Sequence, residues 1–373
     1  MQRRQMSRCV LAIASAAMWA CGAEGDAVAE SGSSAGQDTG TDGRSVEDAR
    51  IGDDAGIDAA ADMGGDGETG GSPADDAGQP EGTTCTGAPG DGTETLLDLG
   101  YDPPPGAAGA LTTLDLVRCR GAAPRPLALL VHGGSWVGGD KANFRTAAPD
   151  FIPWWLGRGY VVAAVNFRLA SPLGRPLEVG PMDQARDIAH ALAWLNDHAD
   201  NYGIDPQQTI AVGYSSGAHL VALLGADGRY LSEVGLPEEH ITATVSLDVH
   251  AYDVPFALGL MVGSVVQDNI PLIEHLFGDT EAEQREASPI AYIDGYVAPA
   301  LLVSVQPSPS EPGTHGYIVS QAAAHYADAL IAAGHVAVTH HDSDESHASL
   351  AMGFGADSDG VTEAVGRFLD TLR

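Results

Sequence analysis

The chain has 373 residues, of which 18 are basic and 51 acidic, and its formal net charge is −33. This balance argues against a nucleic-acid-binding protein, because phosphate recognition needs clustered Lys and Arg. The hydrophobic content of 44% is ordinary for a globular protein. No apolar run reaches the roughly 18 residues that a membrane-spanning helix needs.

The N-terminus resembles an export signal. Residues 1–20 contain three arginines and no acid, and residues 10–20 are small or apolar. This pattern predicts a signal peptide. Cys21 then follows Ala20 in a sequence that resembles a bacterial lipobox. We therefore expect an exported lipoprotein with Cys21 lipidated, in the periplasm or at the cell surface, whose lipid anchor is its only membrane contact. Cleavage near Ala23 and simple secretion are the alternative.

Residues 22–84 have the composition of a disordered tether. They contain sixteen acidic residues, two basic residues and no aromatic residue. Such a segment cannot bury enough apolar surface to offset the entropy lost on ordering. Its Asp-Gly pairs raise the possibility of calcium binding, but their spacing does not match an EF-hand loop.

Residues 85–373 have the length of one large α/β domain. The domain holds two cysteines, Cys85 and Cys119. In an exported protein we expect them to form a disulfide, with two buried free thiols as the alternative.

Apolar, β-branched runs alternate with helical patterns along this domain. The predicted strands are 96–99, 111–119, 127–131, 160–166, 209–213, 242–248, 300–305 and 336–340. The predicted helices are 182–197, 216–225, 318–333 and 361–372. Strand-helix alternation indicates an α/β fold, here a mostly parallel eight-stranded sheet with helices on both faces and antiparallel strands at its first edge.

A G-x-S-x-G motif, residues 213–217, lies between a predicted strand and a predicted helix. In that context the serine, Ser215, occupies a sharp turn that exposes its hydroxyl above the sheet. The turn also directs the N–H groups of the following helix at the reacting centre. A plain helix cap is the alternative explanation.

A second glycine motif, residues 132–136 (His-Gly-Gly-Ser-Trp), follows the strand 127–131. Its glycines let backbone N–H groups approach a substrate carbonyl on which negative charge develops. We expect an oxyanion hole formed by the N–H groups of Gly133, Gly134 and Ser216, with Ser135 in place of Gly133 as the alternative loop donor. An ordinary Gly-Gly turn is the alternative.

These motifs resemble the α/β-hydrolase fold in its H-G-G-x-W esterase branch. That branch includes hormone-sensitive-lipase-like carboxylesterases, the BD-FAE group and kynurenine formamidases. Further matching pieces are 139–141 (Gly-Asp-Lys), 166–170 (Asn-Phe-Arg-Leu-Ala), 202–206 (Tyr-Gly-Ile-Asp-Pro) and 287–290 (Ala-Ser-Pro-Ile). The resemblance implies a serine nucleophile but identifies no particular substrate.

The resemblance also implies a catalytic histidine after the last strand, near which His335, His340, His341 and His347 lie. His347 precedes an apolar helical segment, as the catalytic histidine of the family does, and we expect it to be the base.

The acid departs from the family pattern. The family usually carries Asp in the loop after the seventh strand, and here the only carboxylate in that loop is Glu311. Some α/β-hydrolases take the acid from the end of the sixth strand instead, where Asp248 and Asp253 lie. We rank Glu311 and Asp253 equally and Asp248 third.

Residues 255–285 lie between the sixth and seventh strands, either as a cap over the site or as a core helix with a surface loop. No cysteine-histidine spacing predicts a metal site, and no phosphate loop or dinucleotide fingerprint implies a cofactor.

The leading functional hypothesis is an exported serine carboxylesterase that works through an acyl-enzyme, on a small-molecule or polysaccharide-linked ester. A formamidase-like amide hydrolase is the second possibility. An inactive α/β-hydrolase that serves as a surface binding module is the third, and the missing Asp is its only support.

Overall fold

A computed structural model describes residue 85 and residues 91–102, 104, 111–121, 123–306 and 310–373. The predicted signal peptide, the lipidation site Cys21 and the tether 22–84 lie outside the described residues. Within the described part, no helix combines the length and the apolar character that crossing a membrane would require.

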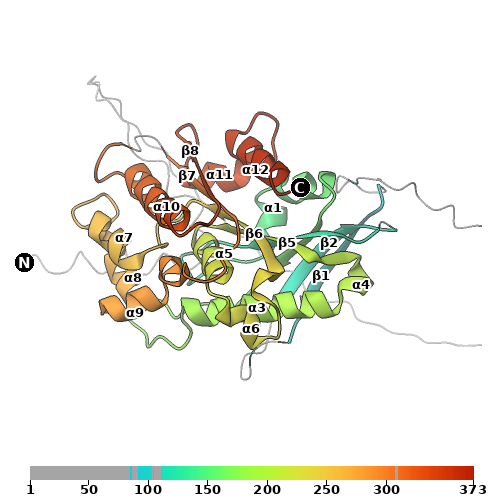
Figure 1. The fold of residues 1–373 in the computed structure, drawn as a ribbon, viewed down its shortest axis with the longest axis horizontal. Coiled ribbons are helices and arrows are strands. Elements are labelled where there is room, and N and C mark those ends of the chain that lie inside the picture. The colour runs from blue at the N-terminus through green and yellow to red at the C-terminus, as the bar shows by residue number, and fades with distance from the viewer. Residues whose placement is uncertain (1–84, 86–90, 103, 105–110, 122, 307–309) are drawn as a thin grey trace, which may run out of the picture. The chain divides into compact units, whose positions relative to one another are not determined.

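Eight strands form one sheet in the order β1-β2-β4-β3-β5-β6-β7-β8 (Figure 1). The pairs β1–β2 and β2–β4 are antiparallel and all other neighbours are parallel. The predicted α/β-hydrolase architecture, a mostly parallel sheet with an antiparallel first edge, is therefore confirmed. The strands are β1 Thr93–Gly100, β2 Thr113–Cys119, β3 Arg125–Val131, β4 Val161–Val165, β5 Ile204–Tyr214, β6 Ile241–Leu247, β7 Ala300–Val305 and β8 Ala337–Asp342.

Helices cover both faces of this sheet. The longer ones lie close to their predicted positions: α3 Pro181–Asp197, α5 Ser216–Ala226, α10 His315–Ala332 and α12 Gly360–Asp370. Two shorter helices agree with expectations: α7 Val254–Met261 with the core helix offered for residues 255–285, and α11 His347–Gly353 with the helical segment expected after His347. The other short helices were not predicted: α1 Asn143–Thr146, α2 Phe151–Gly157, α4 Ala199–Tyr202, α6 Arg229–Glu233, α8 Ile270–Phe277 and α9 Glu281–Glu286. Short 3-10 helices also occur among the described residues, at Glu238–His240, Gln267–Asn269 and Pro289–Tyr292.

The strand periodicity creates two hydrophobic cores. In β3, Leu127, Leu129 and Val131 face the core under α3, α5 and α10, while Ala128 and Leu130 face the core under α1, α2, α11 and α12. Both sets are fully buried, which is why these strands are apolar throughout.

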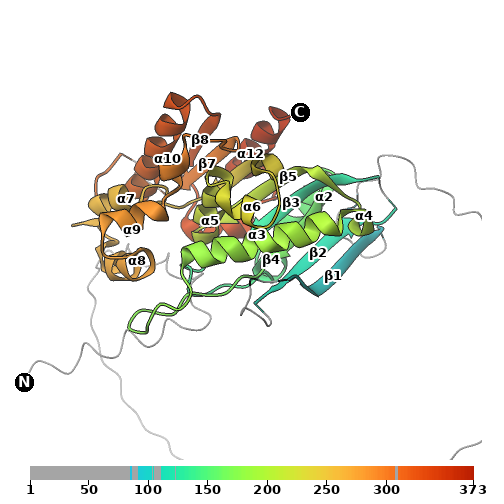
Figure 2. The same cartoon turned by 60° about the horizontal axis from the view of Figure 1, so that its bottom comes forward.

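The segment between β6 and β7 forms three helices, α7, α8 and α9, which gather beside α10 (Figures 1 and 2). Met261 of α7 and Phe277 of α8 are buried in the same core as α3, α5 and α10. The turn after α7 is different, because Val262 and Val265 are 72% and 75% exposed. The segment therefore combines a packed base with an exposed apolar turn.

Candidate active site

Ser215 occupies the turn between β5 and α5. Its backbone is strained, with φ 54° and ψ −123°, and its N–H donates to the carbonyl of Leu247 at the end of the adjacent β6. A Cβ on Gly213 would collide with the carbonyl oxygen of Gly217, and a Cβ on Gly217 with that of Val131. The two flanking glycines are therefore required by the close approach of the backbone, as the motif predicts.

His347 begins α11, directly after the loop that follows β8. The preceding residue, Ser346, caps this helix by accepting a hydrogen bond from the N–H of Ser349. The Nε2 atom of His347 lies 3.1 Å from the Oγ atom of Ser215. The hydroxyl of Tyr214 donates to the His347 carbonyl at 2.6 Å, and the two rings pack 4.9 Å apart. Tyr214 thus links the serine turn to the histidine, a role that the sequence analysis missed.

Asp248 supplies the carboxylate that contacts His347. Its Oδ2 atom lies 2.5 Å from Nδ1 of His347, and its Oδ1 atom accepts from the N–H of Val305 at 2.9 Å. The side chain is fully buried. Burial alone would raise the pKa of Asp248, but the hydrogen bond and charge of His347, the nearby His315 and the Val305 amide together hold the pKa below its ordinary value.

The two carboxylates ranked above Asp248 lie elsewhere. Glu311 is exposed in the turn before α10, where its carbonyl accepts from Thr314. The Asp253 carboxylate caps α7 by accepting from the N–H of Phe256 at 3.2 Å, and its other oxygen lies 3.1 Å from Nε2 of His325. The two carboxylates ranked first therefore do not contact His347, and the one ranked third does. The reason is topological: β6 lies next to β5, so a carboxylate at the end of β6 emerges beside the serine turn.

Two of the three predicted oxyanion donors, Gly133 and Ser216, lie next to Ser215, and Gly134 follows Gly133 in the same loop. A Cβ on Gly133 would stand 2.8 Å from the Ser215 Cβ, which shows how closely that backbone approaches the serine. Gly134 has φ 137°, a conformation that favours glycine, and Ser216 is the first residue of α5. Among the described residues, the backbone N–H groups of Gly133 and Gly134 donate no hydrogen bond. They are free to bind an oxyanion.

Buried side chains hold the loop that carries these glycines. The indole N–H of Trp136 donates to Nδ1 of His219 at 3.3 Å, and Nε2–H of His219 donates to the Ala287 carbonyl at 2.8 Å. Burial lowers the pKa of His219 to about 4, so its ring is neutral and can accept from Trp136. The Gln184 amide donates to the carbonyl of Trp136 at 2.7 Å. The motif tryptophan is therefore an anchor for the oxyanion loop.

Cys85 and Cys119 form a disulfide, with a Cα–Cα distance of 5.8 Å. It attaches the start of the domain to the end of β2. The part of the chain that the structure describes contains no group of three or more His, Cys, Asp or Glu side chains arranged to hold a metal ion.

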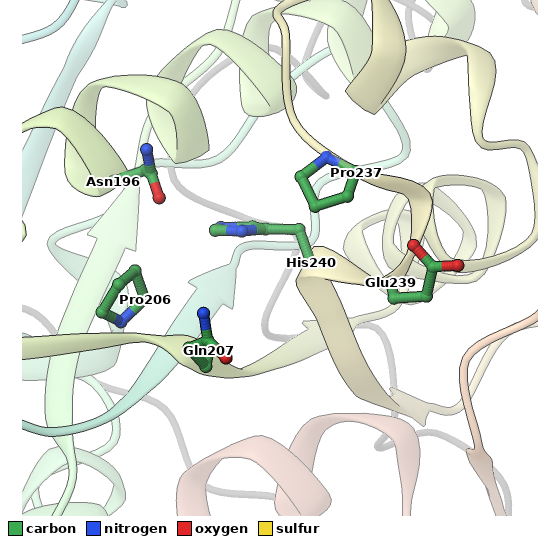
Figure 3. A pocket seen from close by; sticks show the side chains of 6 residues that line it. All are labelled: Asn196, Pro206, Gln207, Pro237, Glu239 and His240. Carbon is green, nitrogen blue, oxygen red and sulfur yellow. The ribbon is translucent and has the colours of Figure 1, made fainter.

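A cavity of about 430 Å³ lies at the other end of the strands (Figure 3). Its lining includes Gln207 near the start of β5 and His240, which directly precedes β6. The triad residues Ser215 and Asp248 follow the carboxyl ends of the same strands. Eight residue steps of ~3.3 Å lead from Gln207 to Ser215 and from His240 to Asp248, so the two regions lie roughly 25 Å apart. This cavity is therefore distinct from the candidate active site.

The serine turn, the histidine after the last strand and the buried aspartate together define an α/β-hydrolase with a Ser-His-Asp site. The BD-FAE family matches residues 114–312, more than half of the sequence. The chain therefore belongs to the BD-FAE family, as the resemblance of the motifs implied.

Individual relatives share only modest sequence identity with this chain. Esterase LipQ of Mycobacterium tuberculosis is 24% identical over 281 residues, which cover 73% of this chain and 62% of LipQ. Esterase LipC of the same organism is 30% identical over 118 residues, 31% of this chain and 27% of LipC. The chain thus spans less than two thirds of the length of either protein. The crystal structure of esterase B from Lactobacillus rhamnosis shares the fold, with a TM-score of 0.58 and 20% sequence identity. The matched region covers 75% of this chain and 85% of the esterase B chain.

Proposed function

We propose that this protein is a serine carboxylesterase that hydrolyses its substrate through an acyl-enzyme. One observation carries the proposal: the continuous hydrogen-bonded series from Ser215 Oγ to His347 Nε2 and from His347 Nδ1 to Asp248. Membership of the BD-FAE family and the esterases among the relatives support ester substrates.

In the proposed reaction, Ser215 Oγ attacks the ester carbonyl while His347 Nε2 takes its proton. Asp248 holds the imidazole in the tautomer that leaves Nε2 free to accept, and stabilises the positive charge that forms. The N–H groups of Gly133, Gly134 and Ser216 bind the oxyanion. His347 then protonates the departing alcohol and leaves the acyl group on Ser215. In the second half, His347 takes a proton from water as the water attacks the acyl-enzyme, and returns a proton to Ser215 Oγ as the acid leaves.

The binding-module hypothesis loses its support, because it depended on a missing acid and Asp248 contacts His347. A comparison of ester and formamide substrates distinguishes the esterase from the formamidase hypothesis. We expect hydrolysis of p-nitrophenyl acetate or butyrate, with no comparable turnover of N-formylkynurenine, and a loss of at least ~1,000-fold in kcat for Ser215→Ala. Turnover of N-formylkynurenine alone would support the formamidase, and no turnover of any substrate by folded protein would support the binding module.

We further propose that the enzyme is exported. The Cys85–Cys119 disulfide supports this, because disulfides persist in oxidising compartments. Metabolic labelling with a radioactive fatty acid tests whether Cys21 carries a lipid anchor. We expect label in the full chain and none in Cys21→Ala. Export without lipid would instead support simple secretion.

A further inference from the structure

Two histidines with no assigned role stand beside the triad. His315 begins α10, and its ring lies 5.7 Å from that of His347 at an interplanar angle of 87°. His250 follows Asp248 by two residues, and both histidines interact electrostatically with Asp248 and His347. They come from different elements, the loop after β6 and the start of α10, and His315 is the one whose ring packs against that of His347.

Both residues are largely enclosed by protein. Burial lowers the pKa of His250 to about 4 and also lowers the pKa of His315, so both rings are uncharged at neutral pH. Each residue nevertheless keeps an intermediate solvent exposure. Uncharged polar side chains that keep some exposure can serve as the polar groups of a substrate site.

His250 also has an unused hydrogen-bonding atom. Its Nε2 is buried and has no hydrogen-bond partner among the residues that the structure describes. His219, which lies nearby, differs because both of its ring nitrogens have partners. A buried polar atom without a partner is costly, and a group on a bound molecule could satisfy it. His219 is therefore a structural histidine, whereas His250, two residues after Asp248, has a ring nitrogen whose hydrogen-bonding capacity is unused.

We propose that His250 and His315 are specificity-determining residues, and that they select esters with a hydroxyl group near the scissile bond over the hydrocarbon isosteres. A neutral imidazole offers one donor and one acceptor, which matches a hydroxyl group. The adjacent Asp248 carboxylate disfavours an anionic group at the same place. This inference rests on the proposed esterase function and concerns the substrate of the same site.

Two pairs of isosteric esters test the inference and locate the hydroxyl. 2-Hydroxyethyl acetate against propyl acetate places it on the alcohol, and methyl 3-hydroxybutanoate against methyl 3-methylbutanoate places it on the acyl group. We expect the wild type to prefer the hydroxylated member of one pair in kcat/KM. His250→Leu should lower that preference about 3- to 10-fold, and His250→Gln, which keeps a donor and an acceptor, should restore most of it.

His190→Leu, a change at a partly buried histidine of α3, is the matched control and should leave the preference unchanged. If His250→Leu does not fold, His315→Leu and His250→Asn supply the comparison. Ester hydrolysis with no preference in either pair, or with a preference that none of these changes lowers, would overturn the inference. Absence of all ester hydrolysis would instead contradict the proposed function.

Discussion

The carboxylate of Asp248 lies 2.5 Å from Nδ1 of His347, although 99 residues separate the two in the chain. The contact exists because β5, β6 and β7 are neighbours, so that the residue after β6 lies between the serine turn and the Val305 amide of β7. The carboxylate that contacts His347 therefore lies one strand earlier than the family pattern predicts.

The first prediction concerns this acid. Asp248→Asn should lower kcat for p-nitrophenyl acetate by ~1,000- to 10,000-fold, because the amide favours the wrong imidazole tautomer and cannot stabilise the imidazolium. Asp253→Asn and Glu311→Gln should each change kcat less than about 3-fold, since neither carboxylate contacts His347. A larger loss in either of them than in Asp248→Asn would contradict the assignment.

The second prediction concerns the glycines of the serine turn. Gly217→Ala should destabilise the domain by more than ~3 kcal/mol, because its Cβ would collide with the Val131 carbonyl of β3. Gly259 of α7 is the matched control: it is exposed and an added Cβ would meet open space, so Gly259→Ala should be neutral or stabilise by up to ~1 kcal/mol. Urea unfolding measures both. Equal stabilities of the two variants would disprove the close approach.

The third prediction is a pH dependence of stability. Burial holds the pKa of His132, His219 and His250 near 4, below the ordinary value of 6.5. Between pH 6.5 and 4 the unfolded chain therefore binds more protons than the folded one, and stability falls as the pH falls. Each of these histidines should lower the free energy of unfolding by up to about 2 kcal/mol between pH 7.5 and pH 5.

Urea titrations at the two pH values check this, and His219→Gln should show a smaller decline than the wild type. The lowered pKa of Asp248 acts in the same direction at lower pH, because its contribution is present above the unfolded value of 3.8 and is lost as the pH falls through the folded one. A free energy of unfolding that is constant or rises on acidification would refute the prediction.

The fourth prediction concerns the disulfide. Replacing both Cys85 and Cys119 by Ser opens a 34-residue loop and should lower the free energy of unfolding by about 2–4 kcal/mol. Thermal unfolding of this variant beside the wild type, with and without reductant, measures the effect. Reductant should shift the wild type but not the variant. Identical melting temperatures in all four samples would mean that the bridge does not stabilise the domain.

The sequence predicted the parts of this molecule that depend on local patterns. The apolar strands and long helices predicted the fold. The two glycines beside Ser215 predicted its position in a sharp turn, because they are required by close backbone contacts within that turn. His347 followed from its place after the last strand. These features are encoded within short stretches of chain, which is why one sequence is enough to find them.

The sequence alone could not tell which carboxylate contacts His347, because that contact depends on strand order. Asp248, Asp253 and Glu311 all lie near strand ends, and only the side-by-side placement of β5, β6 and β7 decides which one reaches His347. The contacts of Tyr214, His219 and His315 are also tertiary. The short helices α8 and α9 escaped prediction because their stability comes from packing more than from helical periodicity.

The central claim is that Ser215 is the nucleophile, and a covalent phosphonate probe tests it most directly. After reaction of the folded protein with a p-nitrophenyl phosphonate ester, peptide mapping by mass spectrometry should find one phosphonyl group on Ser215, with p-nitrophenol released in equal amount. Ser215→Ala should take up no label, and His347→Ala should react far more slowly. A label on another residue, or an unlabelled and correctly folded wild type, would contradict the account.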